Sequence, residues 1–280
     1  MVYARASYLV SVGVVEKIAQ CLGSIRDPIP EEDCHSHSHS QSQGILEFLN
    51  QALAFLSAIV GTLACRSPIQ SLGKRPGDPT QLLATLEVTE LAGTVSMLYG
   101  MLLYQGEPPS KGRTPPPPLG ESILAIIGSV VSFLVSAAQA DTLLLQTILG
   151  SEGMSLEFRH ISSYLLWYFT HWEEKDLLHQ LISLIGYFTV HHLDNQLLVQ
   201  SGQQPSVLQQ LATLPLAYFT DSDLTRILFP TLIAASYSNP ENTAVLQQEI
   251  NPQLLEEFLE SPEAQGIHLI QLLKSGISKH

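Results

Sequence analysis

Apolar residues recur along most of this chain at the spacing of three and four that places them on one face of an α-helix. In the segment 123–140 the apolar positions of one face are separated by serines, and they are Ile123, Ile126, Ile127, Val130, Phe133, Leu134 and Ala137. The segments 7–23, 45–65 and 80–106 have similar helical patterns. The two-residue alternation typical of strands is scarce. The pattern therefore predicts an all-α protein.

Low-complexity stretches separate the helical patterns. One is rich in His, Ser and Gln, another is rich in Pro, and neither contains the apolar groups whose burial offsets the entropy lost on ordering. Both are therefore expected to be linkers. The predicted division is an N-terminal helical segment at 1–32, a linker at 33–43, irregular helical repeats at 44–106, a linker at 107–120, armadillo-like repeats at 121–260 and a divergent tail at 261–280.

The strongest pattern is an internal repeat with a spacing of 47 residues. Asn195 corresponds to Asn242 and Pro205 to Pro252, and neighbouring apolar positions match at the same offset. A repeat of about 40–47 residues made only of helices is typical of armadillo and HEAT proteins. We therefore predict an armadillo/HEAT-like helical repeat solenoid. Its repeat-defining structural residues are Asn195, Gly202, Pro205, Asn242 and Pro252.

Each copy of the repeat has a recognisable order of signals. An Asp or Asn opens a short helix, a break follows at Gly202 in the first copy, and a proline stands where the first turn of the next helix tolerates one. Acidic residues at 173–176 and 221–223 then precede a longer apolar helix, whose N-terminus they favour. An earlier copy at 141–150 is blurred. If the divergent tail leaves the last repeat uncapped, Leu254, Leu255 and Phe258 are exposed.

The charge of the chain argues against nucleic acid as a partner. Its net charge is −13, and its 13 Lys and Arg residues are scattered. Contacts to phosphates supply most nucleic-acid affinity and need clustered basic residues, so no direct nucleic-acid binding is expected. Only 14% of the residues are charged, which favours a surface that packs against other proteins.

The segment 123–140 also raises a membrane alternative. It contains no charged residue over 18 positions, which is long enough to be tested as a membrane span. A stripe of serines at near-helical spacing favours a buried helix of a solenoid instead. A membrane-embedded helical protein that uses 123–140 as a span stays the alternative reading.

Catalytic and metal-binding signals are absent from the sequence. The phosphate-binding and nucleophile motifs GxxxxGK[ST], GxGxxG and GxSxG do not occur, so we predict no enzyme activity and no cofactor. The tract that contains His35, His37 and His39 follows Cys34, but alternation with serine in a loop does not preorganise a tetrahedral metal site. No metal is therefore expected. The three cysteines form no CxxC pair, which is typical of a reducing, cytosolic compartment.

Several segments resemble a known family. The segments 155–161, 177–196, 199–202 and 228–237 are similar to the C-terminal region of the S phase cyclin A-associated proteins in the endoplasmic reticulum, and the similarity extends from about residue 8 to about residue 258. The resemblance implies a fragment or isoform of a cytoplasmic, endoplasmic-reticulum-associated adaptor of the cell cycle, linked to cyclin A and its kinase and peripheral to the membrane. The family's zinc finger and charged helical regions do not occur here, so the resemblance places the cyclin contact outside this chain.

The long repeat helices supply the candidate surface. Armadillo proteins that hold extended peptides are similar in a ladder of Asn on the inner helix, and in this register that position falls near Tyr187 and Ala234. The accompanying Trp position falls near Ser183 and Pro230, so the ladder is absent. Pro230 is also expected to kink its helix. The inner surface must therefore recognise a different kind of ligand.

An aromatic run supplies the remaining candidate. Tyr164, Trp167 and Tyr168 share one helical face and are expected to pack in the core between repeats, with an exposed anchor as the alternative. We name Tyr187, His191 and Trp172 as candidate partner contacts. The sequence thus predicts a non-enzymatic scaffold or adaptor that binds other proteins.

Overall fold

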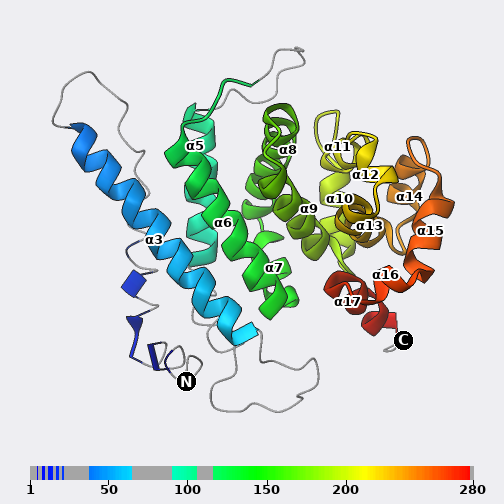
Figure 1. Cartoon of the computed structure of the whole chain (residues 1–280), viewed down its shortest axis with the longest axis horizontal. Helices are drawn as coiled ribbons and strands as arrows, with labels where there is room; N and C mark the ends of the chain where they lie inside the picture. Colours follow the sequence, from blue (N-terminus) through cyan, green and yellow to red (C-terminus); the bar gives the residue numbers. More distant parts are fainter. Residues whose placement is uncertain are drawn as a thin grey trace. The chain divides into compact units, whose positions relative to one another are not determined.

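The computed structural model of the chain describes residues 38–64, 90–105 and 116–277, together with scattered positions between 5 and 21 (Figure 1). Every regular element in these residues is an α-helix, which confirms the predicted all-α class. The chain forms two compact units, Met1–Ser110 with Pro116–Ile148 and Lys111–Pro115 with Leu149–His280. The boundary falls inside the segment 121–260 that the sequence predicts as one array.

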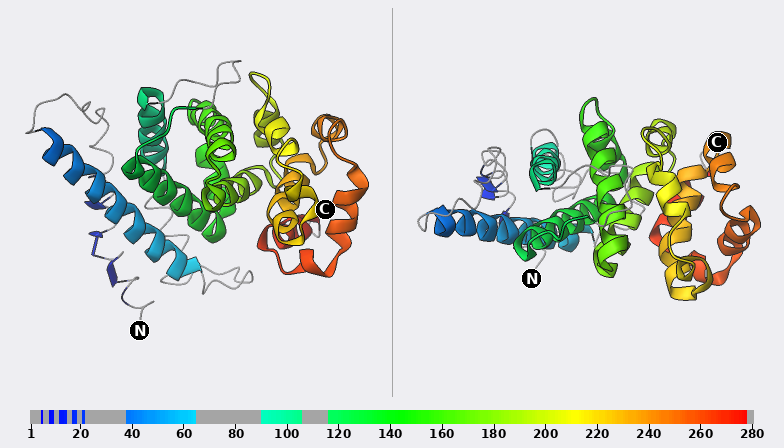
Figure 2. Two further views of the ribbon diagram at one scale, coloured as in Figure 1. Left: turned by 45° about the horizontal axis from the view of Figure 1, so that its top comes forward. Right: turned by 90° about the horizontal axis from the view of Figure 1, so that it is seen from above.

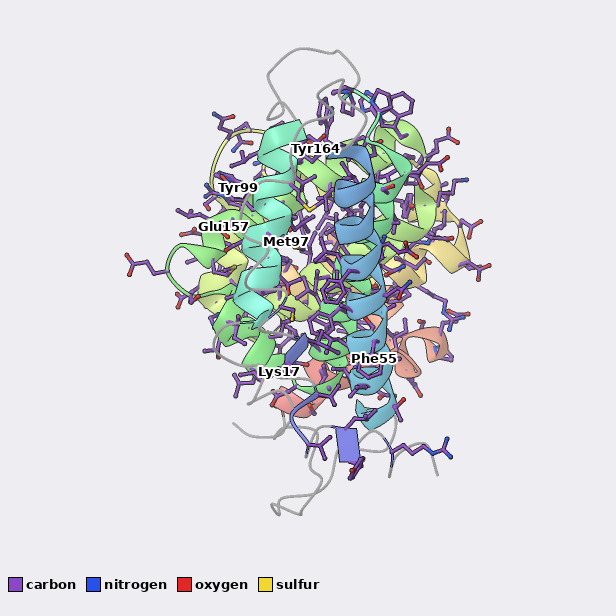
Figure 3. The ribbon with its side chains drawn as sticks, turned by 90° about the vertical axis from the view of Figure 1, so that its left-hand side faces the viewer. Lys17, Phe55, Met97, Tyr99, Glu157 and Tyr164 are labelled. Atoms are coloured by element: carbon purple, nitrogen blue, oxygen red, sulfur yellow. The ribbon has the colours of Figure 1, made fainter. Side chains whose placement is uncertain are left out.

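The first unit is organised around one apolar helix. Its helices are α3 (Ser38–Ala64), α5 (Glu90–Gln105), α6 (Glu121–Ala140) and α7 (Thr142–Leu149). Helix α6 packs along α3 and also contacts α5. Figure 3 shows α3 and α5 with their side chains, among them Phe55 on α3 and Met97 on α5. All seven positions of the predicted apolar stripe are buried. The Ser129 hydroxyl donates a hydrogen bond of 3.1 Å to Asn50 Oδ1 on α3, so a polar contact joins the two helices beside this stripe.

Helix α6 is also long and apolar enough to cross a membrane. Its mean hydropathy is 2.1, and half of the apolar stretch is buried within the protein. The central helix of a water-soluble protein meets the same criteria, because burial against protein and burial in lipid favour the same residues. Helix α6 is therefore weak support for the membrane alternative.

The first linker prediction needs a correction. Helix α3 begins at Ser38, inside the segment 33–43 that we predicted as a linker, so residues 38–43 are helical. These residues contain no Pro or Gly, and their glutamines are good helix formers. An apolar helix that follows directly can therefore extend backward through them, because propagation of a helix is easier than its nucleation.

Other predictions fall on residues that the structure does not describe. Cys34, His35, His37 and most of the segment 1–32 lie outside the described residues, as does the segment 107–115. Nothing is described of the side chain of His39.

The second unit is a succession of long and short helices. They are α8 (Met154–Trp172), α9 (Lys175–Thr189), α10 (Leu193–Gln200), α11 (Val207–Ala212), α12 (Ala217–Thr220), α13 (Ser222–Ser236), α14 (Pro240–Leu246), α15 (Pro252–Glu260), α16 (Pro262–Gln265) and α17 (His268–Ile277). Figure 2 shows these helices from two further directions. The core of the unit lies between α8, α9 and α13, where α9 packs on both of the others.

The two longer repeat helices begin and end 47 residues apart. Helix α9 spans Lys175–Thr189 and α13 spans Ser222–Ser236, as the acidic start signals predict. At α13 the Asp221 side chain accepts hydrogen bonds from the backbone N–H groups of Asp223 and Leu224, which a helix leaves without internal partners. Pro230 lies inside α13, which runs as one helix through it.

The proline prediction is confirmed in one copy and wrong in the other. Pro252 occupies the first turn of α15, after the N-cap Asn251. Pro205 instead precedes the N-cap residue of α11, which is Ser206. The Ser206 hydroxyl accepts from the backbone N–H of Gln209, and the Gln209 side chain accepts from the backbone N–H of Ser206. This capping box satisfies the start of α11 without a first-turn proline.

The last helices cover most of the apolar surface that an uncapped repeat exposes. Helices α16 and α17 lie beside α13 (Figures 1 and 2). Phe258 of α15 is buried with its ring against Phe229 of α13, at 5.3 Å between centroids, and Leu255 is buried as well. Leu254 alone of the three expected residues is exposed. The expectation of an open end is therefore wrong for Leu255 and Phe258.

Candidate protein-interaction surface

Asn195 and Asn242 are both buried, and they make the same contact at the end of the preceding long helix. The side-chain amide of Asn195 donates a hydrogen bond of 2.9 Å to the carbonyl of Phe188, and that of Asn242 donates one of 2.7 Å to the carbonyl of Ala235. Each acceptor lies seven residues earlier, in the last turn of its helix. The last carbonyls of a helix have no partner within it, so each asparagine caps the helix that precedes it.

The turn between the long and the short helix is also repeated. His191 and Ser238 both adopt a left-handed backbone, with φ of 53° and 55°. The side chains of His192 and Asn239 then accept hydrogen bonds from the backbone N–H groups of Asn195 and Asn242. Segments 47 residues apart thus share the conformation of the turn and both of its caps.

A third short helix, in the first unit, has only part of this pattern. At the start of α7 the Asp141 side chain accepts a hydrogen bond of 3.0 Å from the backbone N–H of Leu144. Leu144 stands where the later copies have a capping asparagine, so only the N-cap of the short helix is retained. This substitution explains why the repeat is blurred in the sequence at 141–150.

Gln196 joins the two copies, and sequence reasoning missed it. Its buried side-chain amide donates to the carbonyls of Ala234, at 2.9 Å, and Tyr237, at 3.2 Å. Its own backbone carbonyl accepts from the Asn242 amide at 2.9 Å. The residue 47 positions later is Thr243, whose hydroxyl bonds to carbonyls nearby in its own copy. Because the two positions differ in type, the repeat pattern gives no signal for Gln196.

Two of the predicted partner contacts lie beneath α17. The Tyr187 hydroxyl shares a hydrogen bond of 3.0 Å with His268 Nδ1, and His191 Nε2 donates one of 2.8 Å to the carbonyl of Leu273. The Tyr187 side chain is only 4% exposed, so α17 would have to leave this position before a partner could contact it. Its bulky ring is covered because α17 lies over the end of α9. The His191 residue is exposed, although its ring contacts α17.

Trp172 lies elsewhere, at the C-terminal end of α8. Its side chain is 42% exposed, and its ring lies 6.3 Å from that of Tyr168. The predicted core packing of the aromatic run is confirmed for Tyr164 and Tyr168, which are buried and stacked at 6.2 Å, whereas Trp167 is partly exposed. Burial raises the pKa of Tyr164. Trp172 is therefore the more exposed of the two tryptophans of this helix.

Gly186 makes room on the face that α17 covers. A Cβ atom added to Gly186 would collide with the Leu269 side chain of α17 and would lie 2.6 Å from the Thr231 hydroxyl of α13. That hydroxyl donates a hydrogen bond of 2.8 Å to the carbonyl of Ile182 on α9. The two long helices are thus tied together beside a position where only glycine fits.

Gly202 has a different structural role. It adopts φ of 98°, a backbone that other residues rarely take, and a Cβ there would lie 3.1 Å from the Arg159 guanidinium carbon. Arg159 donates a hydrogen bond of 2.9 Å to the Ser201 hydroxyl. Gly202 therefore lets the chain leave α10 while an arginine of α8 packs against the turn.

Three histidines of the second unit have lowered pKa values. Burial lowers the pKa of His268, and it is also the main cause that lowers the pKa of His179, whose Nε2 lies 2.9 Å from the Tyr218 hydroxyl. Burial, together with the charge of Arg159, lowers the pKa of His160. Within the described part of the chain no three His, Cys, Asp or Glu side chains are grouped closely enough to hold a metal ion.

The positions of an asparagine ladder are filled by packing residues. Ala234 and Pro230 are buried in α13, and the Ser183 hydroxyl donates to the carbonyl of His179 in its own helix. None of these three side chains offers an amide to an extended peptide.

The comparisons with known proteins give one relative. No protein-family model matches the chain. The chain is 36% identical over 254 residues, which is 91% of its length, to the human protein named S phase cyclin A-associated protein in the endoplasmic reticulum. The resemblance inferred from the sequence is thereby confirmed. The chain spans only 18% of that protein's length.

Proposed function

We propose that this chain is a non-enzymatic protein–protein interaction scaffold, built from armadillo-like helical repeats. The observation that carries the proposal is the pair of buried asparagines, Asn195 and Asn242, which cap equivalent helices 47 residues apart. The contacts of Gln196 support the stacking of one copy on the next. Stacked repeats of this kind present extended surfaces, which repeat proteins use to bind other proteins.

The repeat-defining residues have distinct roles in this proposal. Asn195 and Asn242 fix the turn after each long helix, Gly202 allows the exit from α10, and Pro252 starts α15. Pro205 marks the corresponding break in the earlier copy. The name of the human relative describes an association and no reaction, which supports a scaffold rather than an enzyme.

The partners and location follow from similarity. The relative's name associates it with cyclin A and with the endoplasmic reticulum. We therefore place this chain at the cytoplasmic face of the endoplasmic reticulum, in an assembly that contains cyclin A and its kinase. The cyclin contact itself lies outside this segment of the family. With 14 acidic and 5 basic residues at 149–280, the second unit is expected to bind proteins and not nucleic acid.

One observation favours a second candidate. Helix α6 has the length and hydropathy of a membrane span, so the chain could be a membrane-embedded helical protein that uses 123–140. The polar contact between Ser129 and Asn50 and the burial of its apolar stripe against α3 and α5 favour the scaffold.

Proximity labelling in cells tests the scaffold proposal. The full chain, carrying a labelling enzyme, is compared with Asn242→Asp, which disrupts the link between copies, and with Gln248→Ala, an exposed substitution in the same region. We expect a reproducible set of proteins with the unchanged chain and with Gln248→Ala, and loss of that set with Asn242→Asp. No protein labelled above the level of a free labelling enzyme would contradict the proposal.

A further inference from the structure

Helix α17 lies on a surface made by the two long helices, which we call the α9–α13 face: Gly186, Tyr187, His191 and Thr231. Three apolar residues of α17 are buried, and they are Leu269, Ile270 and Leu273. The opposite side carries Gln271, Lys274 and Ser275, which are exposed. An amphipathic helix thus covers this face of the repeats.

The face fits a helix at three points. At one end the Tyr187 hydroxyl bonds to the His268 ring, and at the other end His191 Nε2 donates to the carbonyl of Leu273. Between them the missing side chain of Gly186 leaves the space that Leu269 enters. Leu273 is the sixth of the ten residues of α17, so His191 binds a carbonyl in the middle of this helix. Together, the three contacts fit the part of a short helix from His268 to Leu273.

The position of α17 differs from that of the two earlier long helices. Helix α9 begins at Lys175 and α13 at Ser222, and the same step of 47 residues leads to Leu269. Lys175 and Ser222 are exposed, whereas Leu269 is only 4% exposed. The contacts of α17 also reach α9, which lies two copies earlier. Helix α17 therefore folds over the α9–α13 face and does not repeat the placement of α9 and α13.

The attachment of α17 is small for its length. Among residues 268–275 of α17, whose burial the structure describes, three of eight are buried, whereas nine of the fifteen residues of α9 are buried. Ordering a residue costs conformational entropy, which burial must offset. Lys274 adds a hydrogen bond of 3.2 Å to the carbonyl of Leu259, on the exposed side. Helix α17 is thus held less firmly than the helices beneath it.

From these contacts we infer that the α9–α13 face is a docking site for an amphipathic helix of a partner protein, and that α17 is the chain's own competing occupant. The partner helix carries apolar residues at the spacing of Leu269, Ile270 and Leu273, and one of its carbonyls accepts a hydrogen bond from His191. The inference rests on the proposed function, because it names where the scaffold holds a partner. Helix α17 shields the apolar surface of the α9–α13 face from water until the partner helix binds.

A peptide-binding experiment on the full chain tests this inference. The probe is a fluorescent peptide with the sequence of residues 264–277, measured by anisotropy. Leu273→Asp in the full chain places a charge in the apolar contact and is expected to release α17. The peptide should then bind at least about tenfold more tightly than to the unchanged chain, because its own competitor is lost.

Matched variants identify the face. Ser275→Asp adds the same charge on the exposed side of α17 and should bind the peptide as the unchanged chain does. Gly186→Val added to Leu273→Asp should abolish the tighter binding, because its side chain fills the space for Leu269. A peptide that itself carries Leu273→Asp should not bind.

Three outcomes would overturn the inference. The first is a folded Leu273→Asp chain that binds the peptide no better than the unchanged chain. The second is loss of the cooperative unfolding transition in Leu273→Asp, which would make α17 an integral part of the core. The third is an unchanged chain that is a dimer and becomes a monomer on Leu273→Asp, which would assign the face to a second copy.

The same variants separate this inference from the proposed function. If proximity labelling finds partners that increase with Leu273→Asp and disappear with Gly186→Val added, both stand. If the partners are labelled equally with all variants, the scaffold function stands and the docking site on the α9–α13 face is refuted.

Discussion

Replacing Asn242 tests the contact that joins the repeats. Its side-chain amide donates to two carbonyls, of Ala235 at 2.7 Å and of Gln196 at 2.9 Å, and the residue is completely buried. Each hydrogen bond contributes about 1 kcal/mol, and a buried acceptor that loses its partner adds about 1 kcal/mol or more. The Asn242 Oδ1 atom has no partner, so its removal returns part of this loss. We expect Asn242→Ala to lower the free energy of unfolding by about 2 to 4 kcal/mol.

Two comparisons sharpen the test. Asn242→Asp keeps the shape but presents oxygen to the two carbonyls, so it should destabilise more than Asn242→Ala. Asn195→Ala removes one side-chain hydrogen bond, to the carbonyl of Phe188, and should cost about 1 to 2 kcal/mol. The exposed Gln248→Ala should stay within about 0.5 kcal/mol of the unchanged chain.

Tryptophan fluorescence during urea unfolding measures these values. The chain has two tryptophans, Trp167 and Trp172, and both lie on α8, so the signal reports the second unit. The midpoint of the transition gives the change in stability where its slope is unchanged. If Asn242→Asp were no more destabilising than Asn242→Ala, or if both matched Gln248→Ala, the amide would not bridge the two carbonyls as described.

Three further predictions use the same preparations. Gly202→Ala should lower the free energy of unfolding by about 1 to 3 kcal/mol, because φ is 98° at this position. Gly266→Ala is the control, since φ is −82° there and the space around it is open, and it should not destabilise the chain. Equal urea midpoints for the two variants would refute the role of Gly202. Burial lowers the pKa values of His179 and His268, so their neutral forms stabilise the fold above about pH 6.5, and that stability is lost as the pH falls through the lowered values. The urea concentration at the midpoint of unfolding should therefore decrease when the pH is lowered from about 7.5 to about 5.5. Replacing both histidines by Gln should make this decrease smaller. A midpoint that rises on acidification would contradict the prediction. Alkaline carbonate extraction should release the chain into the supernatant, and retention in the membrane pellet would favour α6 as a span.

The sequence predicted the helices well where apolar spacing and caps agree. The buried stripe of α6 and the starts of α9 and α13 follow from such signals. It did not predict Gln196, because a glutamine on a short helix looks the same whether it faces water or a neighbouring copy. The burial of Tyr187 was not predicted for a related reason. Its exposure depends on where α17 lies, and contacts between distant segments are not encoded in local spacing.

The capping errors have local causes. Pro205 matched Pro252 in sequence, but Ser206 and Gln209 form a capping box that starts α11 at Val207, two residues after the start that the match predicts. The blurred copy at 141–150 lost its capping asparagine to Leu144 while it kept the Asp141 N-cap. The repeat is therefore clear in the sequence where both the N-cap residue and the capping asparagine are present, and it is hard to recognise where the asparagine is missing.

Hydrogen exchange of the full chain tests the central claim, that successive copies are coupled into one array on which a scaffold function depends. Asn242→Asp is compared with the unchanged chain and with Gln248→Ala. We predict faster exchange of amides in α10, where Gln196 lies, as well as at the end of α13 and in α14. Faster exchange confined to α14, with α10 unchanged, would show that the copies are independent and would contradict the array.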